Sequence, residues 1–257
     1  MHVSLLASGS SGNAIYVHAG ATRVLVDAGL TGKQVEKRLG AIGVDPDVLQ
    51  GIVVSHEHSD HIKGVGVLAR RYRVPVLMTQ GTLDASKEIF RGTERIRVFD
   101  NDEAFAFGDL SFQPFAISHD AADPVNFLVS DGDAQVGIAT DMGVVTQLVY
   151  QRLKGADLVV MEANYDRELL INGPYPWDLK KRISSRHGHL SNDRAAEALG
   201  NLAEAGAKQA VLAHLSEKNN RPDLAKQTCC NYLERCGVSR FPVTVARQDR
   251  PTDIFVI

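Results

Sequence analysis

The stretch VVSHEHSDHIKG, residues 53–64, holds four side chains of the types that bind transition metals: His56, His58, Asp60 and His61. Its apolar start predicts an extended chain, in which His56 and His58 can face the same side. Asp60 and His61 then fall where the next helix begins, a position that favours a carboxylate. Two pairs of ligands suit two adjacent metals better than one. The alternative is a polar loop that is rich in histidine by chance, but the whole chain has only nine histidines, so we favour the metal site.

Three further candidate ligands stand at the ends of apolar strands elsewhere in the chain: His119, Asp141 and His214. Ligands at strand ends are held rigidly, as a catalytic metal requires. Taken singly, His119 could be a loop residue, Asp141 a helix cap and His214 a core histidine, because most such residues are structural. Together with the first four residues they supply the ligands that a pair of metals still lacks.

The composition is that of an ordinary globular protein. The chain has 257 residues, 44% hydrophobic and 23% charged, which leaves one large domain and two small ones equally open. We expect no membrane span, because no apolar run approaches the roughly 20 residues that a bilayer crossing needs. The start, MHVSLLASGSSGN, has no basic leader, so we expect no signal peptide. Three cysteines close together, Cys229, Cys230 and Cys236, argue against a disulfide framework and for the cytoplasm.

The formal net charge of -3 means that any contact with nucleic acid must come from a local basic patch. Two basic runs could supply one, although such runs are more often the solvated face of a helix. The first is Lys180, Lys181, Arg182 and Arg186, and the second is Arg70, Arg71 and Arg73.

Short apolar strands alternate with helices in both halves of the chain, which predicts two sheets covered by helices. Residues 95–118 have the pattern of hairpin strands, and residues 126–141 predict a hairpin that turns at Asp131–Gly132–Asp133. We expect a helix near Thr31–Leu39, capped by Thr31, and one over 191–206, capped by Ser191 or Asn192. Further strands are expected at 2–8, 13–19, 22–29, 51–55, 75–79, 157–164, 209–216, 243–246 and 253–257, and further helices at 62–72 and 224–236.

The order His-x-His-x-Asp-His, then a single His, a single Asp and a late His, resembles the metallo-β-lactamase fold family. The resemblance implies one domain over 1–257, of α/β (α+β) class, built as a four-layer αββα sandwich. It also implies two divalent metal ions (Zn, Mn or Fe). One would lie on His56, His58 and His119, the other on Asp60, His61 and His214, with Asp141 bridging both. Asp27, in VLVDAG, matches the first motif of the family and would brace the metal-binding loop.

The chemistry that this resemblance implies is hydrolysis. A pair of metals can hold a bridging hydroxide as nucleophile and stabilise the attacking and leaving oxygens. Since imidazole binds metal in its neutral form, we expect activity to fall in mild acid.

The stretch RHGHLSNDRAAEALG, residues 186–200, is similar to the tRNA 3′-processing endonuclease branch of this family. By that similarity His189 would contact the scissile phosphate or act as general acid on the leaving oxygen, and Glu162, in VVMEAN, would orient it. A protonated histidine beside a carboxylate is a competent acid for an alkoxide leaving group. The alternative is that His189 merely precedes the cap of a helix.

A narrower resemblance rests on five motifs: SGSSGNA (8–14), SHEHSDH (55–61), EANYD (162–166), GPYP (173–176) and the segment Arg182–Asn192. Together they are similar to the bacterial YycJ/WalJ-like subfamily, which implies 5′→3′ exonuclease action on DNA.

The sequence therefore predicts a binuclear metal-dependent phosphodiesterase, most directly a 5′→3′ DNA exonuclease. The predicted catalytic residues are Asp60, His189 and Glu162. The predicted substrate-binding residues are Lys181, Arg182, Arg186, Ser191 and Asn192. Nucleic acid, DNA rather than RNA, is the expected partner, and a homodimer stays open. Two other functions stay open as well: a phosphodiesterase of small cyclic or nucleotide substrates, and a non-catalytic regulatory protein that binds metal.

Overall fold

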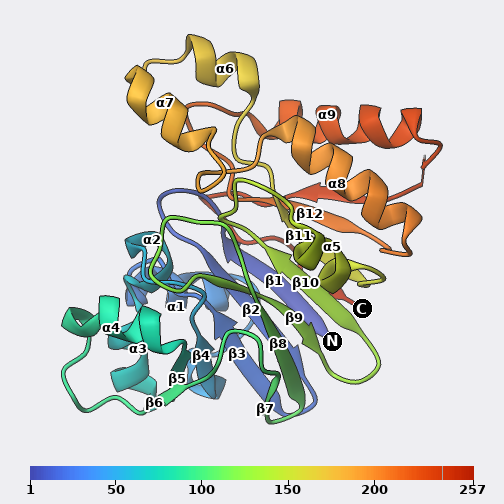
Figure 1. The fold of residues 1–257 in the computed structure, drawn as a ribbon. Coiled ribbons are helices and arrows are strands. Elements are labelled where there is room, and N and C mark those ends of the chain that lie inside the picture. The colour runs from blue at the N-terminus through green and yellow to red at the C-terminus, as the bar shows by residue number, and fades with distance from the viewer. Residues whose placement is uncertain (239) are drawn as a thin grey trace. The chain divides into compact units, whose positions relative to one another are not determined.

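The computed structural model describes residues 1–238 and 240–257, which form two compact units. Unit 1 consists of Met1–Ala116, Ala121–Val125 and Arg247–Ile257. Unit 2 consists of Ile117–Asp120 and Asn126–Ala246. Figure 1 follows the chain through its helices and strands. The strands form two sheets, flanked by helices, so the predicted α/β class is confirmed. The prediction of one domain over 1–257 stays a prediction.

The sheet of unit 1 has seven strands in the order β14-β1-β2-β3-β4-β5-β6. Pairing is antiparallel from β14 to β3 and parallel from β3 to β6. The strands are β1 (His2–Ala7), β2 (Ala14–Ala19), β3 (Thr22–Val26), β4 (Gly51–Val53), β5 (Val76–Met78), β6 (Ile96–Val98) and β14 (Phe255–Val256). In β1 to β5 all apolar side chains are buried, as in strands that are covered on both faces, whereas the edge strands β6 and β14 are half-buried or exposed.

The prediction for residues 95–118 holds only in part. β7 (Phe105–Phe107) and β8 (Leu110–Ala116) form an antiparallel hairpin in unit 1. β6 instead pairs in parallel with β5, because a helical connection precedes it and returns the chain in the same direction.

The helices of unit 1 are α1 (Gly32–Ala41), α2 (Ser59–Ile62), α3 (Val65–Tyr72) and α4 (Gln80–Ala85), with 3₁₀ turns η1 (Pro46–Val48) and η2 (Lys87–Ile89). The predicted cap of α1 is confirmed: the Thr31 side chain accepts from the Gln34 amide in a capping box. Val35 and Leu39 turn toward the sheet and join the buried apolar cluster of this unit.

Unit 2 contains five strands in the order β13-β12-β11-β10-β9, parallel from β10 to β13. They are β9 (Val125–Ser130), β10 (Gln135–Ala139), β11 (Leu158–Glu162), β12 (Ala210–Ala213) and β13 (Val243–Val245). The predicted β9–β10 hairpin is confirmed. It turns where the Asp131 carboxylate accepts the amides of Asp133 and Ala134 and Gly132 takes a positive φ of 96°.

The helices of unit 2 are α5 (Gln147–Leu153), α6 (Arg167–Asn172), α7 (Trp177–Ile183), α8 (Asn192–Glu204) and α9 (Pro222–Arg235). The Ser191 side chain caps α8, as predicted, by accepting from the Arg194 amide. Helices α8 and α9 lie side by side, while α6 and α7 extend away from the strands of this unit (Figure 1). Across the two described ranges, no helix has the length and apolar character needed to cross a membrane.

Candidate metal centre

In unit 1 the predicted ligands occupy the loop after β4 and the first turn of α2. His58 is the N-cap residue of α2, and His61 lies buried within that helix. The ring centroid of His56 lies 4.8 Å from that of His58 and 4.1 Å from that of His61. The short strand and the tight helical turn thus gather three imidazoles.

Asp27 and Ser55 fix the orientation of two of these imidazoles. The Ser55 hydroxyl donates to Asp27 Oδ2 at 2.8 Å, so its oxygen can accept from His56 Nδ1, which lies 2.9 Å away. Nδ1 of His61 lies 2.8 Å from the same carboxylate oxygen, to which it donates. Both histidines therefore carry their proton on Nδ1 and keep the Nε2 lone pair as the ligand atom, the tautomer that carboxylate–histidine–metal arrangements use. The contacts of Asp27 are those of a residue that braces the loop.

Asn13 also holds this loop, although its side chain was not among the predicted site residues. Its amide N–H donates to the Asp60 carbonyl at 2.7 Å, and its side-chain nitrogen lies 3.3 Å from Asp60 Oδ2 and 3.1 Å from His61 Nε2. Gly29 makes this approach possible, because a Cβ there would overlap the Asp60 carbonyl oxygen. The sequence feature that could have indicated this role is the position of Asn13 at the end of the glycine-rich stretch SGSSGN.

Three predicted site residues adopt left-handed backbone conformations that residues other than glycine rarely take. The φ angles are 61° for Asp27, 57° for Asp141 and 54° for His214, and each residue directly or nearly follows a strand. In the part of the chain that the structure describes, the only other such residue that is not glycine is Arg73, the C-cap of α3. Strained backbone of this kind clusters at functional sites.

In unit 2 a second set of donors surrounds the Asp141 carboxylate. Its Oδ1 lies 3.4 Å from His214 Nε2 and 4.0 Å from both His119 Nε2 and His189 Nδ1. The side chains of His119, Asp141 and His214 are almost completely buried. One ligand atom from each of Asp141, Glu162, His189 and His214 lies within 4.8 Å of the others, close enough to hold a cation.

Glu162, which is fully buried at the end of β11, connects two histidines of this set. Its Oε1 lies 2.7 Å from His189 Nδ1 and 3.2 Å from His214 Nδ1. Its Oε2 accepts the backbone amides of Met142 at 2.9 Å and Leu190 at 3.3 Å. The carboxylate accepts from both Nδ1–H groups, which leaves Nε2 of each ring available. The side-chain nitrogen of Asn164 donates to the His214 carbonyl at 2.8 Å and lies 3.1 Å from His214 Nδ1, and Asn164 was not among the predicted site residues.

The electrostatics of the Glu162–His189 pair are those of a general acid. Burial lowers the pKa of His189, but the charge and hydrogen bond of Glu162 outweigh it, so the pKa lies above its ordinary value. Burial likewise opposes ionisation of Glu162, but the charge of and hydrogen bonds from His189, with those of His214, bring its pKa below the usual range. The pair therefore favours an imidazolium beside a carboxylate.

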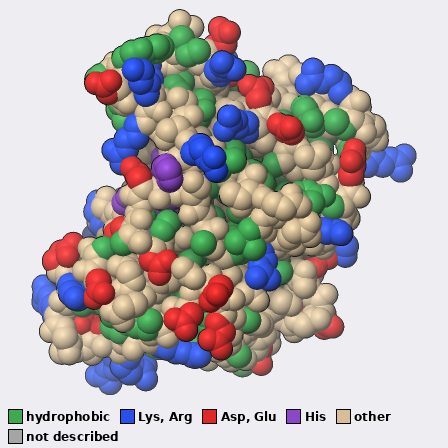
Figure 2. All heavy atoms as spheres, in the orientation of Figure 1, with side chains coloured by type: hydrophobic (Ala, Val, Ile, Leu, Met, Phe, Trp, Pro, Cys, Tyr) green, Lys and Arg blue, Asp and Glu red, His purple; other side chains and the backbone are tan. Residues whose placement is uncertain are grey.

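The predicted substrate-binding residues occupy different environments. Lys181 and Arg182 are exposed on α7, and Figure 2 shows Lys and Arg side chains gathered over this part of unit 2. Arg182 Nε donates to Asp120 Oδ2 at 2.8 Å, and Arg186 is exposed after the helix. Asn192 is buried, with its amide paired to that of Asn220, and Ser191 is used as the cap of α8. A binding role for these five residues stays a prediction.

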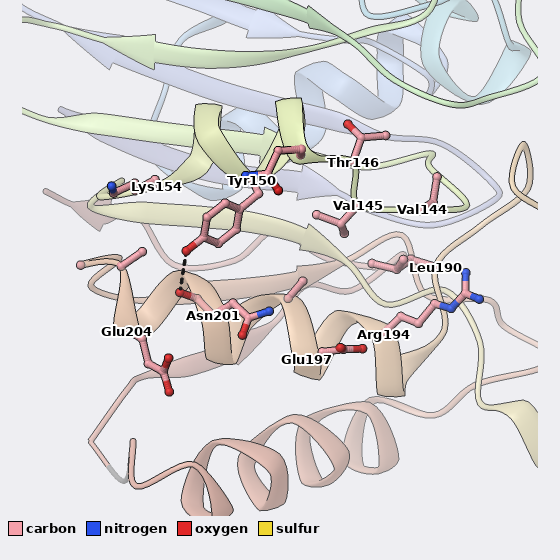
Figure 3. Close-up of a pocket in the computed structure, with 14 residues that line it drawn as sticks. Val144, Val145, Thr146, Tyr150, Lys154, Leu190, Arg194, Glu197, Asn201 and Glu204 are labelled. Carbon is pink, nitrogen blue, oxygen red and sulfur yellow. Dashed lines mark hydrogen bonds between the residues drawn. The ribbon is translucent and has the colours of Figure 1, made fainter.

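A large pocket of about 1120 Å³ lies in unit 2 between α5 and α8 (Figure 3). The Tyr150 side chain extends across the pocket, and its hydroxyl donates to the Asn201 carbonyl at 3.4 Å. Arg194 and Glu197 line the pocket nearer the start of α8. Its described lining includes none of the predicted metal ligands, although Leu190 follows His189 directly. The donor clusters, rather than this cavity, are therefore the candidate reactive centre.

Two curated proteins are similar to the chain over most of its length. "Exodeoxyribonuclease YycJ" of Bacillus anthracis is 39% identical over 239 residues, which cover 92% of this chain and 90% of that protein. "Exodeoxyribonuclease WalJ" of Streptococcus pneumoniae serotype 2 (strain D39) is 40% identical over 239 residues, which cover 91% and 89%. The similarity thus extends along nearly the whole chain.

The profile of a family described as "Beta-lactamase superfamily domain" matches residues 22–215, a range that includes all the predicted metal ligands. Among solved structures, the metallo-beta-lactamase fold protein YhfI from Bacillus subtilis superposes with a TM-score of 0.75 at 17% identity, covering 98% of both chains. At that identity the likeness shows the fold.

Proposed function

Because the chain belongs to the beta-lactamase superfamily, we propose that it is a metal-dependent phosphodiesterase that cuts DNA as a 5′→3′ exonuclease. The observation that carries this proposal is the pair formed by the buried Glu162 and the half-buried His189, beside Asp141 and His214. A proton donor next to metal ligands suits cleavage of a bond whose leaving group is an alkoxide. The names of the two relatives, both exodeoxyribonucleases, support DNA as the substrate.

The donor sets fit divalent cations. In each unit, carboxylates hold Nδ1 of histidines so that Nε2 is the ligand atom, and the set mixes imidazole with carboxylate. Such sites accept zinc, manganese or iron. Following the family pattern, two metals would be held by His56, His58 and His119, and by Asp60, His61 and His214, with Asp141 shared. In this proposal the two units act as one domain over 1–257, which the family match across residues of both supports.

Bound cations of this class would supply a water-derived nucleophile at neutral pH, because they lower the pKa of bound water to about 7. The protein supplies the proton for the leaving group. His189 holds one proton on Nδ1 against Glu162, and in its protonated form it carries a second on Nε2. It gives this proton to the departing oxygen, while Glu162 keeps the ring in place and stabilises its charge.

The DNA backbone would contact the basic side chains Lys181, Arg182 and Arg186, since phosphate contacts need only a few cations. Ser191 and Asn192 would support this surface from the start of α8. We also place the protein in the cytoplasm, a location that its three free cysteines support.

The test is cleavage of one duplex DNA labelled at either the 5′ or the 3′ end, with zinc or manganese returned to metal-stripped protein. The Asp60→Ala variant runs alongside. Rapid release of the 5′ label as a mononucleotide, with late release of the 3′ label, is the expected result. Release of neither label, together with turnover of bis-p-nitrophenyl phosphate, would replace DNA by RNA or small diesters as the substrate.

A further inference from the structure

Residues 166–187 form an arm, made of α6, α7 and the loops around them, that contributes little to the core. Leu170 is the one buried residue of this segment, all of which the structure describes, and α7 contains none. Helices of globular domains are normally stabilised by burying one apolar face. In the α6–α7 arm every other residue is half-buried or exposed, so core packing explains little of this segment.

Trp177, at the start of α7, is the only tryptophan of the chain, and 60% of its surface is exposed. The ammonium of Lys180 lies over the ring, 5.7 Å from its centroid, and donates to the Ile171 carbonyl at 2.7 Å. This bond holds Lys180 beside the ring, while Trp177 remains largely open to solvent. A large, exposed aromatic surface is what an unpaired nucleobase stacks on.

The charge of the same segment indicates which kind of ligand the arm would bind. Residues 177–186 hold four cations, Lys180, Lys181, Arg182 and Arg186, against one anion, Asp178, in a chain whose net charge is -3. Cations spaced along a helix next to an aromatic ring match a chain of phosphates that carries free bases. A base-paired duplex offers this ring only its terminal pair, whereas a single-stranded end offers every base.

A backbone hydrogen bond joins the arm to His189, the proposed general acid. The His189 amide donates to the carbonyl of Ile183, the last residue of α7, at 2.8 Å. Gly188 allows this approach, because a Cβ there would overlap the carbonyl oxygens of Arg182 and Ile183. A strand held on α7 is thereby placed in a fixed relation to the imidazole of His189.

We infer that the α6–α7 arm binds a single-stranded 5′ end of DNA, with an unpaired base on Trp177 and phosphates on Lys181 and Arg186. The inference rests on the proposed nuclease function and adds the form of the substrate. The enzyme would act on overhangs and frayed ends in preference to blunt ends.

The first test uses the single tryptophan as the reporter. Wild-type protein is titrated with a phosphorothioate-linked duplex that has a 5′ overhang, and with a blunt duplex of equal length. Stacking on Trp177 should quench the fluorescence with the overhang and far less with the blunt end. Equal response to both would overturn the inference. So would a fluorescence change that follows protein concentration without DNA, because a second copy of the chain would then cover the arm.

The second test compares Trp177→Ala and Trp177→Phe with Leu148→Ala, which removes another exposed apolar side chain of the same unit. On the overhang duplex, Trp177→Ala should raise KM roughly tenfold with little change in kcat, the size expected for the loss of one stacked base. Trp177→Phe should restore most of the binding, and Leu148→Ala should resemble wild type. Turnover of bis-p-nitrophenyl phosphate should be unchanged in all three.

The two proposals fail in different ways. If wild-type protein cuts the overhang duplex and Trp177→Ala does so with an unchanged KM, the arm has no part in binding and the nuclease function stands. If wild-type protein cuts no DNA of either form, the nuclease function fails and the inference fails with it.

Discussion

Nδ1 of His189 lies 2.7 Å from Oε1 of the buried Glu162, and the same oxygen lies 3.2 Å from Nδ1 of His214. One carboxylate thus orients both a proposed proton donor and a proposed metal ligand. The two functions should separate on mutation, because Glu162 contacts the rings only at their Nδ1 side.

Replacing His189 by Ala should slow DNA cleavage by about 10²–10⁴-fold, the usual contribution of a general acid. The metal content, measured by elemental analysis, should stay at the wild-type level, because His189 is outside the proposed ligand set. His187→Ala is the matched control, since His187 is exposed two residues away and should behave as wild type. Wild-type turnover in His189→Ala would remove the acid assignment.

Replacing Glu162 by Gln should move the alkaline limb of the pH–rate profile to lower pH. The acid acts in its protonated form, which is present below its pKa, and the charge of Glu162 raises that pKa. Loss of the charge lowers the pKa of His189, so the active form disappears at a lower pH. The profile of kcat/KM against pH measures the shift, with the exposed Glu234→Gln of α9 as control. An unmoved limb would mean that another group sets it.

Treatment with a chelator should abolish cleavage, and zinc or manganese should restore it. In Asp60→Ala, neither metal should restore activity, and bound metal should fall, because a carboxylate ligand is removed. Asp84→Ala, which removes an exposed carboxylate of α4, should keep both. Activity that survives complete metal removal would rule out metal-dependent hydrolysis.

The double variant Lys181→Ala, Arg186→Ala should weaken DNA binding uniformly across sequences. The slope of log Kd against log salt concentration should fall by about 1 for each phosphate that the variant no longer neutralises. Binding measured by fluorescence anisotropy at several salt concentrations gives the slope. Lys226→Ala, an exposed lysine on α9, is the control. Identical slopes in the double variant and wild type would place the DNA elsewhere.

Gly29→Ala should damage the metal loop, because the added Cβ overlaps the Asp60 carbonyl, which accepts from the Asn13 amide. Overpacking of this kind costs about 1–3 kcal/mol, which thermal unfolding would show together with loss of bound metal. Gly40→Ala is the control: its Cβ meets nothing within 4 Å, and alanine is the better helix former. A Gly29→Ala protein as stable and as metal-rich as wild type would contradict the packing described here.

Much of the fold could be predicted because its strands are short apolar runs with polar residues at their ends. Val53, Ala139 and Ala213 end buried strands, and the sequence already marked the His and Asp residues that follow. The helix caps Thr31 and Ser191 could also be predicted, because a hydroxyl just before a helical pattern can accept a hydrogen bond from a backbone amide of the first turn.

The rest depends on contacts between segments that are distant in the sequence. Asn13 meets Asp60 across 47 positions, and Asn164 meets His214 across 50, which no local pattern reveals. Helix α7 buries no residue, so the apolar periodicity that predicts helices was weak there. The parallel pairing of β6 with β5 is likewise determined by tertiary contacts rather than by the local sequence.

The left-handed backbone at Asp27, Asp141 and His214 has a consequence for engineering. Each such residue holds a conformation that glycine would adopt at less cost. A laboratory search for heat-resistant variants would therefore tend to select Asp141→Gly or His214→Gly and discard the donors. Thermal tolerance and turnover should trade against each other at these positions, and a selection scheme should score both.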